Sequence, residues 1–106
     1  MKKHRIEKDL LGSLELPEDV YWGIHTERAI RNFPISGYRV NPSLIKAMAM
    51  VKKACVMANL ETGYLEEKKA QAIMTACAEI AAGTLSEHFP VDALQGGAGT
   101  STNMNV

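Results

Sequence analysis

The sequence lacks an excess of either charge. Its 106 residues carry twelve basic and twelve acidic side chains, and the formal net charge is zero. No summed electrostatic field would therefore attract nucleic acid or an anionic membrane surface. The basic opening, residues 1–5, is followed by polar residues instead of the apolar stretch of a secretory signal. Since no apolar run approaches the roughly 20 residues that span a bilayer, we expect a cytoplasmic protein with no nucleic-acid or membrane partner.

Cysteine is also scarce. Cys55 and Cys77 are the only two. They form no C-x-x-C motif, and both fall among apolar residues at helical spacing. This pattern favours two buried, reduced thiols over a disulfide or a pair of metal ligands.

The three histidines show no spacing that is typical of a metal site. His4, His25 and His88 lie far apart, and the sequence contains neither an H-E-x-x-H motif nor a nucleophile elbow. We therefore expect no metal at these residues and predict that each histidine is a surface residue or makes a local hydrogen bond. His25 stands out because it precedes a predicted helix and lies beside Tyr21-Trp22-Gly23.

The sequence does contain enough apolar material for one small, mainly helical domain. Hydrophobic residues make up 46% of the chain, which suffices for a modest core. Residues 5–20 combine short apolar pairs with Gly12-Ser13 and a proline, and this predicts a short β-hairpin or an extended arm. A brief helix is expected from Thr26 to Phe33, with Thr26 as its N-cap and Glu27 in its first turn.

Two longer helices are predicted to form an antiparallel hairpin. Asn41 and Pro42 suit the N-cap and first position of a helix that runs to about Glu61. A second helix is signalled from Leu65 to Ala82. Apolar residues recur at spacings of three and four along both helices and predict the faces that pack together. These residues are Leu44, Met48, Val51, Cys55 and Ala58 on the first helix, and Ala70, Ile73, Cys77 and Ile80 on the second.

Glycines and methionines give two further indications for this hairpin. Gly63 and Gly83 follow the two predicted helices, where glycine commonly ends a helix. Met48, Met50 and Met57 could line a groove for a partner protein, but packing within the hairpin is the favoured interpretation.

The last segment differs in kind. Glycines at 96, 97 and 99 precede Thr100-Ser101-Thr102-Asn103. A conformationally permissive turn thus leads into residues that cap helices well, and a helix should begin near Thr100 or Ser101. Free backbone N–H groups at such a turn, with hydroxyl and amide donors beside them, suit an anion such as a carboxylate. The same residues also fit a plain glycine-rich connection with a Ser/Thr cap.

Phosphate is the rival anion, and the usual phosphate-binding loops do not fit. A P-loop requires a lysine after its last glycine, but Thr100 follows Gly99. A dinucleotide fingerprint requires a third glycine where Thr102 stands.

The chain ends at Val106, roughly one turn into the predicted helix, without a C-cap glycine or a proline. We therefore expect a fragment that is cut within a helix.

Three stretches of the sequence carry a family resemblance. They are Arg5-Ile6-Glu7-Lys8-Asp9-Leu10-Leu11-Gly12, Tyr21-Trp22-Gly23-Ile24-His25-Thr26, and Phe89-Pro90-Val91-Asp92 leading into Gln95-Gly96-Gly97-Ala98-Gly99-Thr100-Ser101-Thr102-Asn103-Met104-Asn105. Together they resemble the N-terminal part of the aspartase/fumarase superfamily of lyases, over essentially the whole chain. Where fumarases typically read Gly-Ser-Gly-Thr-Gln, this chain is similar to the aspartate ammonia-lyase branch.

The resemblance implies that residues 1–106 form the N-terminal domain of a lyase that interconverts L-aspartate with fumarate and ammonia. It implies that Thr100 contacts the side-chain carboxylate of the substrate, while Ser101, Thr102 and Asn103 support or line the site. It also implies a homotetramer without an organic cofactor. The central helical bundle, the C-terminal domain and the serine base of the family lie outside these residues, so we expect no catalytic residue here and no activity from the fragment alone.

Two alternatives stay open at this point. The chain could be the N-terminal part of a fumarase or of another lyase in the superfamily. It could instead be a non-catalytic helical interaction module that uses the stripe of Met48, Val51 and Cys55.

Overall fold

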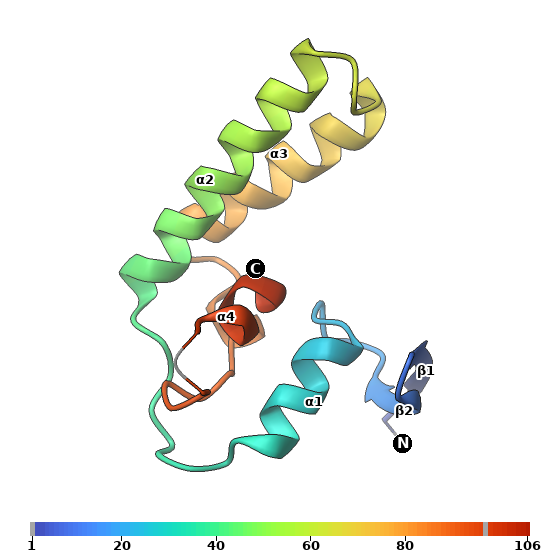
Figure 1. Ribbon diagram of the computed structural model, residues 1–106, viewed down its shortest axis with the longest axis vertical. Coiled ribbons are helices and arrows are strands. Elements are labelled where there is room, and N and C mark those ends of the chain that lie inside the picture. Colours follow the sequence, from blue (N-terminus) through green and yellow to red (C-terminus); the bar gives the residue numbers. More distant parts are fainter. Residues whose placement is uncertain (1, 97) are drawn as a thin grey trace. The chain divides into compact units, whose positions relative to one another are not determined.

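The computed structural model describes residues 2–96 and 98–106 and is mainly α-helical (Figure 1). Gly97, part of the glycine-rich motif, lies outside the described residues. The elements in chain order are β1 (His4–Asp9), β2 (Gly12–Pro17), α1 (Ile24–Asn32), α2 (Pro42–Glu61), α3 (Glu67–Ala81), the 3-10 helix η1 (Ser86–His88) and α4 (Thr100–Asn105). This confirms the predicted fold class, a small helical unit with a helical hairpin and an N-terminal β-hairpin.

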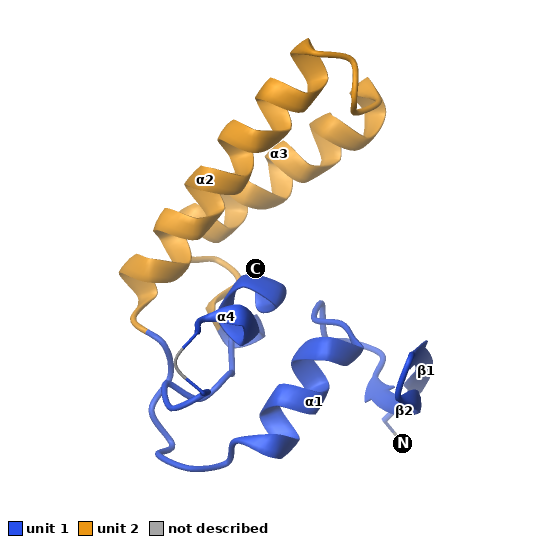
Figure 2. Ribbon diagram, in the orientation of Figure 1, with its two compact units in different colours: residues 1–40, 87–105 blue, residues 41–86, 106 orange. Residues whose placement is uncertain are grey.

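The described chain divides into two compact units (Figure 2). Residues 1–40 and 87–105 make up the first unit, and residues 41–86 with 106 make up the second. The first unit thus holds both strands, α1 and α4, whereas the second holds the α2–α3 hairpin.

Strands β1 and β2 form a two-stranded antiparallel sheet in which His4 pairs with Pro17 and Asp9 with Gly12. The turn between them is held by the Asp9 carboxylate, which accepts a hydrogen bond from the Leu11 amide at 2.9 Å. Gly12 has a φ of +123°, a conformation that favours glycine. Leu16 is fully buried. The expected hairpin at residues 5–20 is therefore confirmed.

Helix α1 begins earlier than predicted. Gly23 is its N-cap, and the Ile24 amide donates instead to the Glu7 carboxylate of β1 at 3.0 Å. The predicted capping role of Thr26 is wrong, because a carboxylate from a distant strand supplies the acceptor that a local side chain would otherwise provide. Glu27 does lie in the first turn, as expected.

The Thr26 hydroxyl is left without a hydrogen-bond partner in the part of the chain that the structure describes, although the residue is only 1% exposed. A buried polar group without a partner costs about 1–3 kcal/mol. Thr26→Val removes this group at nearly constant shape, so we expect it to raise the free energy of unfolding by about 1 kcal/mol.

The measurement is urea unfolding followed by the fluorescence of Trp22, the only tryptophan and a residue of the first unit. Thr102→Val is the matched control, because Thr102 is also buried but its hydroxyl donates to Gln95 at 2.8 Å. That variant should be less stable than wild type. A Thr26→Val variant that loses as much stability as Thr102→Val would contradict the expectation.

The α2–α3 hairpin has the ends that the sequence predicted, within two residues. The Asn41 side chain accepts a hydrogen bond from the Ser43 amide at 2.9 Å, with Pro42 at the first helical position. Gly63 and Gly83 follow α2 and α3 with φ values of +82° and +80°, in the left-handed region where glycine ends helices.

The predicted packing face of α2 is wrong. Its buried residues are Ile45, Ala49 and Val56, whereas Leu44 and Val51 of the predicted face are 48% and 62% exposed. Apolar residues occur around most of the circumference of α2, so spacing alone does not identify the packed face. On α3 the predicted Ala70 and Cys77 are buried, but Ile73 is exposed.

The predictions for the cysteines and methionines are partly wrong, because a different face of α2 is buried. Both cysteines are free, but only Cys77 is buried and Cys55 is exposed. Met50 and Met57 are 59% and 53% exposed, so the prediction that they pack within the hairpin is wrong. Met48 is half-buried.

Candidate functional site

The glycine-rich segment of the first unit turns sharply before α4. Gly96 and Gly99 have φ values of +95° and +81°, which an L side chain rarely adopts. The Gly99 carbonyl accepts a hydrogen bond from the Asn103 amide at 3.1 Å, the first bond of α4. The predicted helix start at Thr100 or Ser101 is therefore confirmed.

One side chain closes this segment into a loop. The Gln95 side-chain oxygen accepts hydrogen bonds from both the amide and the hydroxyl of Thr102, each at 2.8 Å. The Gln95 amide nitrogen donates to the Asp92 carbonyl at 2.8 Å. Gln95 thus connects the Asp92 backbone with the first turn of α4.

The Asp92 carboxylate fixes the base of the loop. It accepts hydrogen bonds from the Ser36 amide and hydroxyl at 2.8 and 2.6 Å, from the Gly37 amide at 3.0 Å and from the Leu94 amide at 2.8 Å. These bonds, above all the one from the Ser36 hydroxyl, hold the pKa of Asp92 well below its ordinary value of 3.8. The residue is buried. Segment 36–37 and the start of the loop are therefore held together by one ionised group.

This lowered pKa predicts a pH dependence of stability. A carboxyl whose pKa is lowered by folding contributes stability that is present above its unfolded pKa, near 4, and is lost as the pH falls through the folded value. Asp92→Asn should therefore lower the free energy of unfolding at pH 7, since its amide presents donors to the Ser36 and Gly37 amides. The difference from wild type should shrink as the pH falls below 4.

Urea unfolding by Trp22 fluorescence between pH 3 and pH 7 measures this difference. Glu7 and Asp9 also have lowered pKa values, because Arg5 and Arg28 donate hydrogen bonds to them, but they titrate in both proteins and cancel. Asp19→Asn, which changes an exposed carboxylate, is the control. A difference that stays constant from pH 3 to pH 7 would refute the assignment to Asp92.

The four predicted site residues lie together on α4 but face different surroundings. Thr100 is exposed and Ser101 is half-buried, and neither hydroxyl has a hydrogen-bond partner within residues 2–96 and 98–106. Thr102 is 4% exposed and faces Gln95. Asn103 is exposed. The geometry therefore leaves the Thr100 and Ser101 donors open to an external acceptor, while Thr102 is already engaged.

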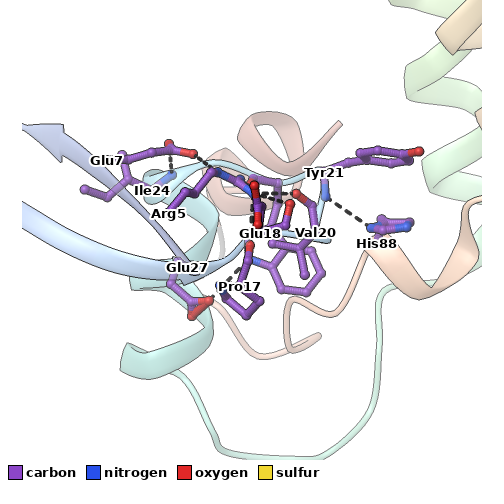
Figure 3. A network of polar contacts seen from close by, with 10 residues as sticks. Arg5, Glu7, Pro17, Glu18, Val20, Tyr21, Ile24, Glu27 and His88 are labelled. Carbon is purple, nitrogen blue, oxygen red and sulfur yellow. Dashed lines mark hydrogen bonds and ion pairs between the residues drawn. The ribbon is translucent and has the colours of Figure 1, made fainter. Parts of the chain in front are cut away.

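His88 lies beside Tyr21 in a cluster that the sequence did not single out (Figure 3). Its Nδ1 accepts a hydrogen bond from the Tyr21 amide at 3.2 Å, and the Tyr21 ring stacks on it with centroids 4.4 Å apart. The His88 carbonyl accepts a hydrogen bond from the Asn105 side chain at 2.8 Å. His88 thus makes a side-chain hydrogen bond, as expected, but its partner lies 67 residues away and the bond is not local in the sequence. His25 is exposed on α1, and no hydrogen bond within the described chain joins it to the loop.

Arg5 organises the segment between β2 and α1 (Figure 3). Its guanidinium donates to the Glu7 carboxylate at 2.7 Å. It also donates to backbone carbonyls of that segment. These are Pro17 at 2.9 Å, Glu18 at 3.2 Å, Val20 at 2.9 Å and Trp22 at 2.6 Å. Because Glu7 in turn caps α1, the pair sets where that helix begins.

The described residues contain no group of three or more His, Cys, Asp or Glu side chains that could hold a metal ion. The same residues contain no helix that is both long and apolar enough to cross a membrane. The candidate site consists of residues 95, 96 and 98–103 and the side chains that anchor them.

Comparison with known sequences gives consistent matches. A family model described as a lyase matches residues 12–106. An aspartate ammonia-lyase from a Bacillus species is 52% identical over 102 residues, which is 96% of this chain and 22% of that protein. One from Pseudomonas aeruginosa is 55% identical over 104 residues, with the same coverages. A class II fumarate hydratase from Halobacterium salinarum is 46% identical over 103 residues, 97% of this chain and 22% of that protein.

Solved structures agree. A Brucella melitensis structure described as fumarate lyase:delta crystallin has a TM-score of 0.94 and 50% identity, covering 97% of this chain and 24% of that one. A class II fumarase from Schistosoma mansoni has a TM-score of 0.93 and 31% identity, covering 97% and 22%. This chain thus spans about a fifth to a quarter of the length of the relatives it matches.

Proposed function

The chain belongs to the lyase family, and we propose that within it this is the N-terminal domain of an aspartate ammonia-lyase, which converts L-aspartate reversibly to fumarate and ammonia. The observation that carries the proposal is identity of 50–55% to proteins named aspartate ammonia-lyase from several bacteria. The sequence Gly97-Ala98-Gly99-Thr100-Ser101 supports the same branch.

In this proposal the loop before α4 binds one carboxylate of the substrate. Thr100 donates its hydroxyl to the side-chain carboxylate, and Ser101 and Asn103 line the site. Thr102 supports it from within. The Thr100 hydroxyl at the start of α4 supports this role, because Thr100 is exposed and its hydroxyl has no hydrogen-bond partner among the residues that the structure describes.

In the proposed reaction, the loop lies beside the part of the substrate on which negative charge develops. A base removes a proton from the carbon next to a carboxylate, and the doubly charged intermediate persists until ammonia leaves. Hydrogen-bond donors that are already in place lower the energy of that intermediate. The remainder of a cytoplasmic, homotetrameric enzyme supplies the base and needs no organic cofactor, so residues 1–106 alone should not turn over substrate.

A substrate comparison on the full-length protein tests the proposal. L-aspartate, malate and argininosuccinate are offered separately, and fumarate formation is followed by absorbance. We expect fumarate and ammonia from aspartate, with little product from the other two. Preference for malate would identify a fumarase instead. Absence of turnover with all three would favour the helical interaction module with its exposed Val51 and Cys55.

A further inference from the structure

The helix α4 lacks a capping side chain of its own. Its N-cap is Gly99, since the Gly99 carbonyl accepts the first helical hydrogen bond, and glycine offers no oxygen to the amides of the first turn. Thr102 is the third helical residue, and its amide is one that an N-cap side chain usually satisfies. Gln95 satisfies this amide from outside the helix at 2.8 Å.

Gln95 binds only some of the hydrogen-bond donors in the first turn of α4. The Thr102 amide and hydroxyl are both engaged, whereas the hydroxyls of Thr100 and Ser101 have no hydrogen-bond partner within residues 2–96 and 98–106. Gln95 therefore separates the structural donors of the turn from those that are free for a ligand.

Gln95 is itself held in place. Its amide nitrogen donates to the Asp92 carbonyl, and the Asp92 carboxylate is anchored by Ser36, Gly37 and Leu94. The side chain is half-buried. A continuous series of hydrogen bonds therefore runs from residues 36–37 to the first turn of α4, all within the first compact unit.

We propose that Gln95 and Thr102 form a clamp that positions the Thr100 and Ser101 donors for the substrate carboxylate. Both are positioning residues: they act through the loop. The inference rests on the proposed carboxylate-binding role of Thr100.

A variant that adds a negative charge at residue 95 distinguishes a positioning role of Gln95 from a purely structural one. Gln95→Glu keeps an acceptor for the Thr102 amide and hydroxyl, loses the donor to the Asp92 carbonyl, and places a negative charge at the start of α4. A carboxylate near a helix N-terminus favours the helix, so this variant should stay folded. The same charge repels the substrate carboxylate, so the KM should rise about tenfold or more. A raised KM in a variant that stays folded and keeps the acceptor for Thr102 is a result that a merely structural role would not produce.

Deletion variants complete the test on the full-length protein. Gln95→Met removes both hydrogen-bonding functions and should lower kcat/KM by about tenfold to a hundredfold, since small misplacements of binding groups cost rates of that order. Thr102→Val should act in the same direction, and Thr102→Ser, which keeps the hydroxyl, should restore activity toward wild type. The double variant Gln95→Met with Thr102→Val should be no worse than Gln95→Met alone, because both changes remove the same contact.

The outcomes distinguish a failure of the clamp from a failure of the proposed function on which it rests. If Thr100→Val lowers kcat/KM while Gln95→Met and Thr102→Val do not, the clamp alone is overturned. If the Gln95 and Thr102 effects add in the double variant, the two residues act separately and the clamp is also overturned. If Thr100→Val has no effect, the proposed function fails and the inference with it. Should Gln95→Met not fold, the Thr102→Val and Thr102→Ser pair decides.

Discussion

Thr100→Val in the full-length protein should lower kcat/KM for L-aspartate by about tenfold to a hundredfold. The substitution keeps the side-chain shape and removes one hydroxyl donor, and a hydrogen bond to a charged group contributes roughly 1.5–3 kcal/mol. Thr100 is exposed, and its hydroxyl has no partner in the described chain. Stability should therefore change little, and the loss should be one of substrate interaction.

The separate changes in kcat and KM show whether the Thr100 hydrogen bond is stronger in the transition state than in the ground state. If Thr100 holds the carboxylate equally in the ground and transition states, only KM rises. We expect kcat to fall as well, because the bond strengthens as negative charge develops on the substrate. Thr75→Val is the matched control, since the Thr75 hydroxyl donates to the Gln71 carbonyl on an exposed face of α3. Unchanged kinetics or an unfolded Thr100→Val protein would identify Thr100 as a structural cap.

Arg5→Met should lower the free energy of unfolding of the first unit by about 2–3 kcal/mol. The variant keeps an apolar stem but removes the donors to four backbone carbonyls, those of Pro17, Glu18, Val20 and Trp22 (Figure 3). It also removes the partner of Glu7, whose pKa is lowered chiefly by the Arg5 hydrogen bond and which caps α1. Urea unfolding followed by Trp22 fluorescence measures the loss, because the Trp22 carbonyl is one of the groups that Arg5 binds.

Arg31→Met is the control for a lost positive charge. The Arg31 side chain is 53% exposed, and it contacts the Glu27 carboxylate at 3.4 Å and the Glu15 carbonyl at 3.0 Å. The Glu27 side chain is 10% exposed, but it keeps a hydrogen bond from the Trp22 ring nitrogen when Arg31 is removed. We therefore expect this variant to lose less stability than Arg5→Met, which loses the bonds to four backbone carbonyls and to Glu7. Equal losses in the two variants would show that Arg5 contributes by charge alone and does not hold the segment.

Features that depend on neighbouring residues were predictable from the sequence. Asn41 caps α2, Gly63 and Gly83 follow their helices with positive φ, and α4 begins at Thr100. In each case the acceptor, the donor or the conformational requirement lies within a few residues of the helix end.

Features that depend on distant residues were not predictable. Thr26 was predicted to cap α1, but the acceptor comes from Glu7. The spacing of apolar residues predicts a packed face of α2 that includes Leu44 and Val51, but both are exposed. The helical period alone cannot identify the packed face when several faces are apolar. At the candidate site, the hydrogen bonds from Ser36 to Asp92 join segments that are 56 residues apart. No local pattern in the sequence indicates such a pairing.

The most direct test is a crystal structure of the full-length protein with fumarate bound. We predict a carboxylate oxygen of fumarate within about 3 Å of the Thr100 hydroxyl oxygen, which is hydrogen-bond distance. The Gln95 side chain should still accept from the amide and hydroxyl of Thr102 in that complex. Fumarate bound at a site where Thr100 lies beyond hydrogen-bond reach would contradict the assignment of this loop to the substrate carboxylate.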